Sequence, residues 1–258
     1  MGRVFVPGTA LLEMVMRAGD EVGCGRVEEL TLAAPLVLPE RGAVRVQVAV
    51  DAPDAAGRRG VGVYSCPDGV GQAVWSQHAV GVLASGAADQ VGGFGDGGVW
   101  PPQGAVPVDA EGCYELFADA GFGYGPVFQG LRAVWRRGEE LFAEVALSDE
   151  VAESADTATG FGLHPALLDA SLHASLLSSL EGQSADGGPA LPFAWEGVSL
   201  FASGATVLRV RLAPAGEHAV SVTAVDPTGA PVISIDALRT RRLTPDEVDA
   251  SHTHLSDA

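Results

Sequence analysis

"HPALLDASLHASLLSSL", residues 164–180, is a stretch with helical composition that is too apolar to face water on any side. Within it, Asp169 and His173 place a carboxyl and an imidazole among leucines and alanines. Residues four apart lie on the same face of a helix, one turn from each other. A helix of this kind must be covered by other elements, and a curved sheet around it is the simplest cover. The sequence therefore predicts a buried central helix at 165–180 with an acid and an imidazole side by side.

Strand-like segments follow this helix, and the first half of the chain repeats the same order. Their alternation and valine content predict antiparallel pairing rather than parallel crossovers. After the helix of the second half, strands are predicted at 193–201, 205–213, 218–226 and 231–243. In the first half, "PGTALLEMVMRAG" (7–19) predicts a helix that opens at Pro7 and Gly8 and ends before Gly19. Its strands are predicted at 26–38, 44–50, 59–65 and 73–84. The expected fold is α+β, with two units that each wrap an antiparallel sheet around one helix.

The two halves differ in what precedes each helix. The second half has a short predicted helix at 110–121, a loop at 124–131 and two strands at 131–137 and 140–147, whereas the first half begins at its helix. Between the halves, the glycine-rich segment 85–104 ends in two prolines and predicts a linker. We therefore predict a first unit at 1–88, a linker at 89–106, a second unit at 107–246 and a polar tail at 247–258.

Composition excludes several classes of partner. The chain has 258 residues, of which 47% are hydrophobic, and a formal net charge of −18, which disfavours nucleic acid and anionic membrane surfaces. No apolar run reaches the ~20 residues of a membrane span. Cys24, Cys66 and Cys113 are odd in number and lack metal-site spacing, so we expect free thiols in a reduced cytoplasmic protein without a metal.

Four stretches together resemble one known family. They are "GRVFVPGTALLEM" (2–14), "GYGPVFQGLRAVWRRG" (123–138), "GLHPALLDASLHA" (162–174) and "LPFAWEGVSL" (191–200). In order and spacing they are similar to the dehydratase domain of a modular type I polyketide synthase, a tandem or double hotdog. The resemblance implies dehydration of 3-hydroxyacyl thioesters carried on the phosphopantetheine of an acyl carrier protein, so the domain needs no cofactor of its own. It also implies neighbouring synthase domains and a homodimer.

The resemblance places the catalytic base outside the sequence. The family's first motif is HxxxGxxxxP, and Gly2 and Pro7 match its last two fixed positions, so its histidine would lie upstream of Met1. The first half also lacks the strands that precede the helix in the second half. We therefore expect an N-terminal truncation, with this chain inactive by itself.

Asp169 is the expected proton donor, and His173 is expected to orient it. An acid must keep its proton near neutral pH, and an apolar helix face favours the neutral carboxyl. The resemblance implies Gln or His at position 173, so a hydrogen-bonding partner suffices there. On spacing alone, a buried structural pair is the more common explanation. His164 precedes Pro165 at the helix start, where we expect a capping or packing role.

Pro7, Gly8, Tyr124 and Gln129 are the expected substrate-binding residues. A helix N-terminus offers free backbone N–H groups to the thioester oxygen as it gains charge, and by resemblance the Gly8 amide is the candidate donor. A plain Pro-Gly helix start explains the same residues. Tyr124 lies in "YGPVFQG" (124–130) with Gln129, and lines the substrate tunnel or packs over the seam between the units.

Two other functions remain open on the sequence. Relatives of the same fold shift a double bond or close a pyran ring with the same helix face, and Asp169 rather than an amide favours plain elimination. A catalytically silent module, kept for structural contacts or carrier docking, is the alternative outside enzyme chemistry.

Overall fold

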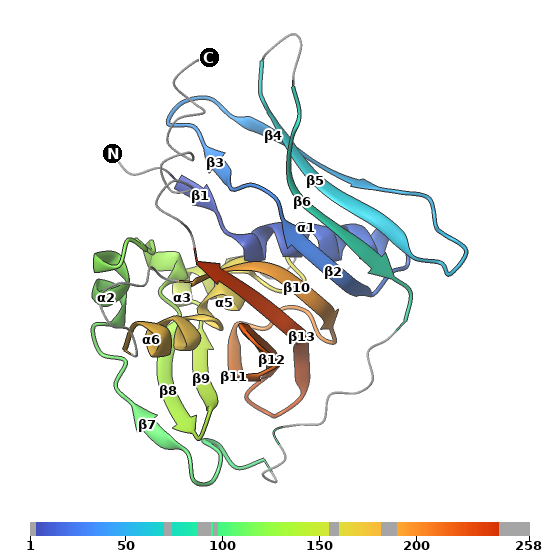
Figure 1. Cartoon of the computed structure of the whole chain (residues 1–258). Helices are drawn as coiled ribbons and strands as arrows, with labels where there is room; N and C mark the ends of the chain where they lie inside the picture. Colours follow the sequence, from blue (N-terminus) through green and yellow to red (C-terminus); the bar gives the residue numbers. More distant parts are fainter. Residues whose placement is uncertain are drawn as a thin grey trace.

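A continuous antiparallel sheet organises the fold. The computed structural model describes residues 4–69, 74–86, 94, 98–154, 160–181 and 190–242. In that part of the chain, eleven strands form one sheet in the order β4-β5-β6-β2-β10-β13-β12-β11-β9-β8-β7 (Figure 1). All of its pairings are antiparallel, as the sequence predicts. The strands are β2 (Arg26–Leu32), β4 (Val44–Val50), β5 (Arg59–Pro67), β6 (Ser76–Ala84), β7 (Val106–Val108), β8 (Leu131–Arg137), β9 (Glu140–Ala146), β10 (Ala190–Leu200), β11 (Val207–Pro214), β12 (Ala219–Val225) and β13 (Pro231–Arg242).

The first helix, α1 (Gly8–Glu21), lies in the curve formed by β2, β4, β5 and β6 (Figure 1). Leu11, Leu12 and Val15 are fully buried on it, which supports the prediction of a wrapped helix. The predicted end before Gly19 is wrong, because the helix continues through Gly19 to Glu21. A Cβ at position 19 would lie 2.6 Å from the Cys24 carbonyl oxygen, so this glycine permits a close backbone contact instead of ending the helix.

The predicted strand at 26–38 divides in two. β2 ends at Leu32, and β3 (Leu36–Leu38) resumes after Pro35, which has no N–H to donate to a strand ladder. β3 pairs with β1 (Val4–Val6) in a separate two-stranded sheet. The expectation that the first half begins at its helix is therefore wrong, because β1 leads directly into α1.

The central helix of the second unit is interrupted. The single helix predicted at 165–180 is observed as α5 (Pro165–Ala170) and α6 (His173–Glu181). At the break, the Ser171 hydroxyl donates to the Leu167 carbonyl at 3.0 Å, a contact that commonly bends helices. Leu167, Leu168 and Leu177 are buried, so the two short helices still form the core of this unit.

Smaller elements precede this central helix. The predicted helix at 110–121 is observed as α2 (Cys113–Asp119), and the 3-10 turn η1 (Pro126–Phe128) and the helix α3 (Asp149–Ala152) accompany it. β8 and β9 fall where the two strands before the helix are predicted. Cys24, Cys66 and Cys113 are buried free thiols, as expected.

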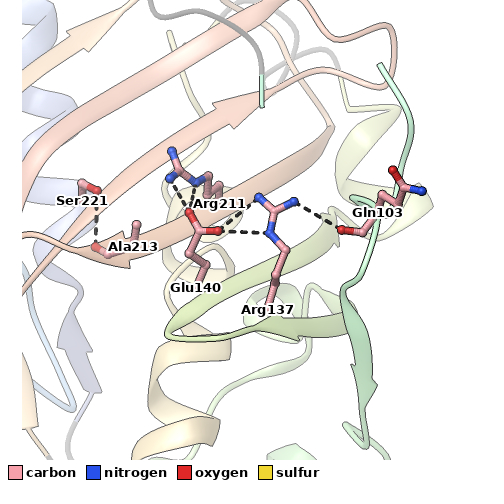
Figure 2. Close-up of polar contacts among 6 residues, drawn as sticks. All are labelled: Gln103, Arg137, Glu140, Arg211, Ala213 and Ser221. Atoms are coloured by element: carbon pink, nitrogen blue, oxygen red, sulfur yellow. Dashed lines mark hydrogen bonds and ion pairs between the residues drawn. The ribbon is translucent and has the colours of Figure 1, made fainter. Parts of the chain in front are cut away.

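Pairing of β2 with β10 joins the two units. Val27 lies opposite Val198 in this pair, so the sheets of the two halves form one continuous sheet, as in a double hotdog. Residues 89–93 and 95–97 of the predicted linker 89–106 lie outside the described residues, and its last residue, Val106, belongs to β7, which pairs with β8. The Arg137 guanidinium holds the segment before β7 in place by donating to the Gln103 carbonyl. It also donates to the Glu140 carboxylate, which forms an ion pair with Arg211 as well (Figure 2).

Glu140 sits at the centre of this polar cluster. Burial raises the pKa of Glu140, but the hydrogen bonds and charges of Arg211 and Arg137 outweigh it and hold the pKa below its ordinary value. The cluster therefore stays ionised and ties β8, β9 and β11 to the segment that enters β7.

Within the described residues, no helix is long and apolar enough to cross a membrane. The predicted tail 247–258 lies outside the described residues.

Candidate active site

Asp169 and His173 meet at the break between α5 and α6. His173 Nε2 lies 3.3 Å from Asp169 Oδ2, and the side chains are 2% and 17% exposed, respectively. The four-residue spacing therefore brings the two groups together, as the sequence predicts, although Ser171 and Leu172 interrupt the helix between them. The carboxyl remains partly open to solvent, while the imidazole is enclosed.

Thr9, which the sequence analysis did not single out, reaches the other carboxyl oxygen. It is the second residue of α1 and is 1% exposed. Its hydroxyl donates to Asp169 Oδ1 at 3.4 Å. The carboxyl therefore has one partner from each of the two central helices. Nothing in the local pattern around Thr9 indicates this contact, because it depends on how the two units pack.

Glu13 makes a second link between the units, also missed from sequence. Its buried carboxylate accepts hydrogen bonds from the Gly162 N–H at 2.7 Å and the Leu163 N–H at 3.3 Å. These residues lead into α5, so Glu13 fixes the start of the helix that carries Asp169. Burial raises the pKa of Glu13, and the two backbone hydrogen bonds only partly offset this.

Pro7 and Gly8 form the N-terminus of α1, one residue from Thr9. Pro7 is the N-cap, and its carbonyl accepts from the Ala10 and Leu11 N–H groups. A Cβ on Gly8 would lie 2.7 Å from the Trp195 ring and 2.9 Å from Leu32 Cδ1. Packing alone thus requires glycine here. Among the described residues, the Gly8 N–H has no hydrogen-bond acceptor, as expected for the first turn of a helix.

Tyr124 packs directly against His173. Their ring centroids are 4.3 Å apart. Burial raises the pKa of Tyr124, and the negative charge of Asp169 raises it further. The phenol therefore keeps its proton. Among the described residues, Gln129 is not hydrogen-bonded to Asp169 or His173. Its amide donates to the Tyr124 carbonyl at 2.9 Å and so braces the loop that holds the tyrosine.

Tyr114, on α2, was also missed by the sequence analysis. Its hydroxyl oxygen lies 3.1 Å from His173 Nδ1 and accepts the Leu131 N–H at 2.8 Å. The only sequence signal is that Tyr114 and Phe117 share a face of a short helix, which is typical of core residues. Both rings lie 5.6 Å from the His173 ring, so α2 closes the side of the imidazole away from Asp169.

His164 caps α5, which agrees with the expected capping role. Its Nδ1 accepts the Ala166 N–H at 3.2 Å, and burial lowers the pKa of the imidazole. Among the residues that the structure describes, His173 is the one histidine hydrogen-bonded to Asp169. No group of three or more His, Cys, Asp or Glu side chains in the described ranges could hold a metal ion.

This arrangement suits proton donation. Asp169 offers a carboxyl near solvent, and hydrogen bonds from His173 and Thr9 would stabilise the carboxylate left after a proton is given up. Thr9, which bonds Asp169, belongs to the first turn of α1, and the N-terminus of a helix favours negative charge on a ligand oxygen.

Family models match both parts of the chain. Residues 1–66 match the model described as "Polyketide synthase dehydratase domain", and residues 95–250 match "Polyketide synthase dehydratase N-terminal domain". The pikromycin polyketide synthase component PikAII of Streptomyces venezuelae is 53% identical over 258 residues, which is all of this chain and 7% of that protein. Across curated relatives at 46–53% identity, the chain spans 3–15% of their length.

Solved structures agree with this assignment. The dehydratase domain from the terminal module of the rifamycin polyketide synthase is 45% identical, with a TM-score of 0.82 over 93% of this chain and 83% of that one. A bifunctional dehydratase-cyclase domain in ambruticin biosynthesis is 43% identical, with a TM-score of 0.87 over 96% and 86%. The chain therefore belongs to the dehydratase domains of modular type I polyketide synthases.

Proposed function

We propose that this chain provides the proton-donating side of a site that dehydrates 3-hydroxyacyl thioesters on acyl carrier protein to 2,3-enoyl thioesters. The observation that carries the proposal is the Asp169 carboxyl, held by His173 from one side and by Thr9 from the other. Donors on both oxygens fix the direction of the carboxyl while leaving it 17% exposed to a substrate.

In the proposed reaction, a base removes the C2 proton and that electron pair forms the C2–C3 double bond. The C3–O bond breaks at the same time or just after, and the departing hydroxyl takes the Asp169 proton and leaves as water. Asp169 is left as a carboxylate, which the donors from His173 and Thr9 stabilise. The proton on the base then returns to Asp169 through solvent, so the cycle balances.

The start of α1 is the proposed site for the thioester carbonyl. As C2 loses its proton, negative charge grows on that oxygen, and the proposed hydrogen-bond donor to it is the Gly8 N–H at the positive end of the helix. Pro7 sets the direction of the first turn by its fixed φ of −66°. Tyr124 lines the site beside His173, and Gln129 holds the Tyr124 loop.

The base is proposed to come from the histidine of the HxxxGxxxxP motif in the longer synthase. In the described residues, no second histidine is bonded to Asp169, and His164 is occupied as a helix cap. The chain by itself is accordingly proposed to be inactive. For the tests below we define the extended segment as this chain lengthened at its N-terminus by residues that supply this histidine.

Mass spectrometry of a 3-hydroxyacyl pantetheine thioester tests the proposal. The extended segment should produce the dehydrated thioester, and its Asp169→Asn variant should not. The same assay decides whether the chain alone is inactive. Equal turnover by the extended segment and its Asp169→Asn variant would remove Asp169 from the reaction, and no turnover by the unaltered extended segment would support a catalytically silent module.

Cyclisation is the second candidate, because the dehydratase-cyclase in ambruticin biosynthesis is similar over 96% of this chain. Closing a ring onto the enoyl thioester consumes the conjugated double bond without changing the mass. Ultraviolet absorbance of the product from a substrate with a distal hydroxyl therefore separates the two outcomes.

The remaining proposals concern setting and partners. The substrate is carried on the phosphopantetheine of an acyl carrier protein, and the domain needs no cofactor of its own. It works beside other synthase domains as a cytoplasmic homodimer. The proposed units are 1–88 and 107–246, with 89–106 between them.

A further inference from the structure

Tyr114 closes a chain of hydrogen bonds that runs behind the proposed acid. The chain passes from the Leu131 N–H to the Tyr114 hydroxyl at 2.8 Å, and from that hydroxyl to His173 Nδ1 at 3.1 Å. On the other side of the imidazole, His173 Nε2 meets Asp169 Oδ2 at 3.3 Å. The phenol and the carboxyl thus contact opposite nitrogens of one ring.

The direction of these hydrogen bonds follows from their donors. A backbone N–H can only donate, so the Tyr114 oxygen accepts from Leu131. The hydroxyl proton then needs an acceptor, and among the described residues that acceptor is His173 Nδ1. A neutral imidazole carries one proton, so a ring that accepts at Nδ1 carries its proton on Nε2.

We propose that Tyr114 is a positioning residue that holds His173 in the Nε2–H tautomer, so that the imidazole donates to Asp169 Oδ2. The inference deepens the proposed function and rests on it for the kinetic test below.

The opposite tautomer would disable the acid. With the proton on Nδ1, the bare Nε2 would face Oδ2 across 3.3 Å and would accept the proton of the carboxyl. The Asp169 proton would then point at the imidazole instead of at the substrate. With Nε2–H in place, Oδ2 accepts a hydrogen bond, and the acidic proton belongs on Oδ1, the oxygen beside Thr9.

The surroundings of Tyr114 keep its hydroxyl in place as a donor. Its ring makes edge contacts with Phe117 at 5.6 Å and with Tyr124 at 6.1 Å between centroids. Burial raises the pKa of Tyr114, so the phenol stays protonated across the working pH range.

Nitrogen NMR of this chain with 15N-labelled histidine tests the tautomer without any activity. His173→Gln identifies the His173 signals. We expect Nε2–H in the unaltered chain and a mixture of tautomers in Tyr114→Phe. Tyr64→Phe is the matched control. It also removes a tyrosine hydroxyl that is hydrogen-bonded to a side chain, Gln77 at 3.1 Å, but Tyr64 lies on β5 in the first unit. Protonation of His173 Nδ1 in the unaltered chain would overturn the proposal, and this result does not require Tyr114→Phe to fold. The proposal would also be overturned if the unaltered chain and Tyr114→Phe showed the same His173 tautomer.

Kinetics of the extended segment separate positioning from general structural support. Tyr114→Phe should lower kcat by about tenfold to a hundredfold with little change in KM, since a lost hydrogen bond or a wrong tautomer acts on the proton transfer. The same substitution in a His173→Leu background should cost nothing more. An equal loss in both backgrounds would show that Tyr114 only supports the fold. If Asp169→Asn leaves the rate unchanged, the proposed function fails, while the NMR result still decides the tautomer.

Discussion

The Thr9 hydroxyl donates to Asp169 Oδ1 at 3.4 Å, across 160 positions of the chain. Thr9 belongs to the first turn of α1, and Asp169 to the last turn of α5, so the contact joins the central helices of the two units. The Asp169 carboxyl is therefore positioned by both units and not by its own helix alone.

Thr9→Val in the extended segment should lower kcat, because valine keeps the shape of threonine but cannot donate to the carboxyl. One hydrogen bond to a group that becomes charged contributes about 1.5–3 kcal/mol, so a loss of at least tenfold is expected. Thr9→Ser keeps the hydroxyl and is the matched control. A valine variant as active as the serine variant would show that the 3.4 Å contact has no role in turnover.

Asp169→Asn should nearly abolish dehydration and leave the melting temperature almost unchanged. An amide is close in shape to a carboxyl and can still accept from His173 at one position while its NH2 group donates to the Thr9 hydroxyl at the other, but it has no acidic proton to give. General acids contribute on the order of 10²–10⁴-fold in rate. Steady-state turnover and thermal unfolding of the same preparation check both parts, and a rate within a few-fold of the unaltered segment would contradict the role.

His173→Gln should retain much more activity than His173→Leu. Glutamine can donate to Asp169 Oδ2 and accept from Tyr114, whereas leucine removes one hydrogen-bond partner from each of these groups in a site where the side chain at 173 is 2% exposed. Loss of a partner to a buried polar group costs roughly 1–3 kcal/mol. Melting temperatures and kcat of the two variants should separate in the same order, and indistinguishable variants would argue against an orienting role.

The sequence predicted the helices and strands better than it predicted the contacts between them. The apolar run around Leu167 and Leu168 and the spacing of Asp169 and His173 are local, so the buried helix and its polar pair could be read from it. Local pattern could not show the break at Ser171, because a side-chain hydrogen bond to Leu167 bends an otherwise helical sequence.

Long-range contacts explain the other omissions. Thr9, Glu13 and Tyr114 reach the site only after β2 pairs with β10 and α2 folds over α6, and none of these pairings has a signal within a short window. Gly8 was expected to offer its backbone N–H to the thioester oxygen. The structure shows a packing reason for glycine at this position, because Trp195 fills the space where a Cβ would lie.

Gly8→Ala should destabilise the fold as well as the site. The added Cβ would lie 2.7 Å from the buried Trp195 ring and 2.9 Å from Leu32 Cδ1, so one of them must move. Overpacking of this kind costs about 1–3 kcal/mol. Gly25→Ala is the control, since a Cβ there would make an ordinary contact, 3.9 Å from the Gly86 carbonyl oxygen. Urea unfolding of both variants measures the difference. Equal free energies of unfolding would mean that the Trp195 ring or Leu32 can move aside without loss of stability.

Glu13 should make stability depend on pH in the direction opposite to a surface carboxylate in an ion pair. Burial raises the pKa of Glu13 in the folded chain above its ordinary value of 4.5, against the backbone hydrogen bonds from Gly162 and Leu163. The charge of Arg17 opposes the rise and that of Asp20 adds to it. A carboxyl with a raised pKa binds its proton more tightly in the folded state than in the unfolded state. Its contribution to stability is therefore complete below the unfolded pKa and is lost as the pH rises through the folded pKa.

Glu13→Gln removes this titration and keeps one carbonyl oxygen for the Gly162 N–H. From about pH 4.5 upward, the free energy of unfolding of the unaltered chain should fall relative to that of Glu13→Gln, and the difference should level off above the folded pKa. Urea unfolding of both chains across that range measures the slope, which does not depend on how much the amide itself changes stability. Glu217→Gln is the matched control, because its carboxyl is 91% exposed. If the Glu13→Gln difference is as flat as that of Glu217→Gln, the buried carboxylate is not coupled to folding, and Glu13 serves only as a fixed acceptor for the start of α5.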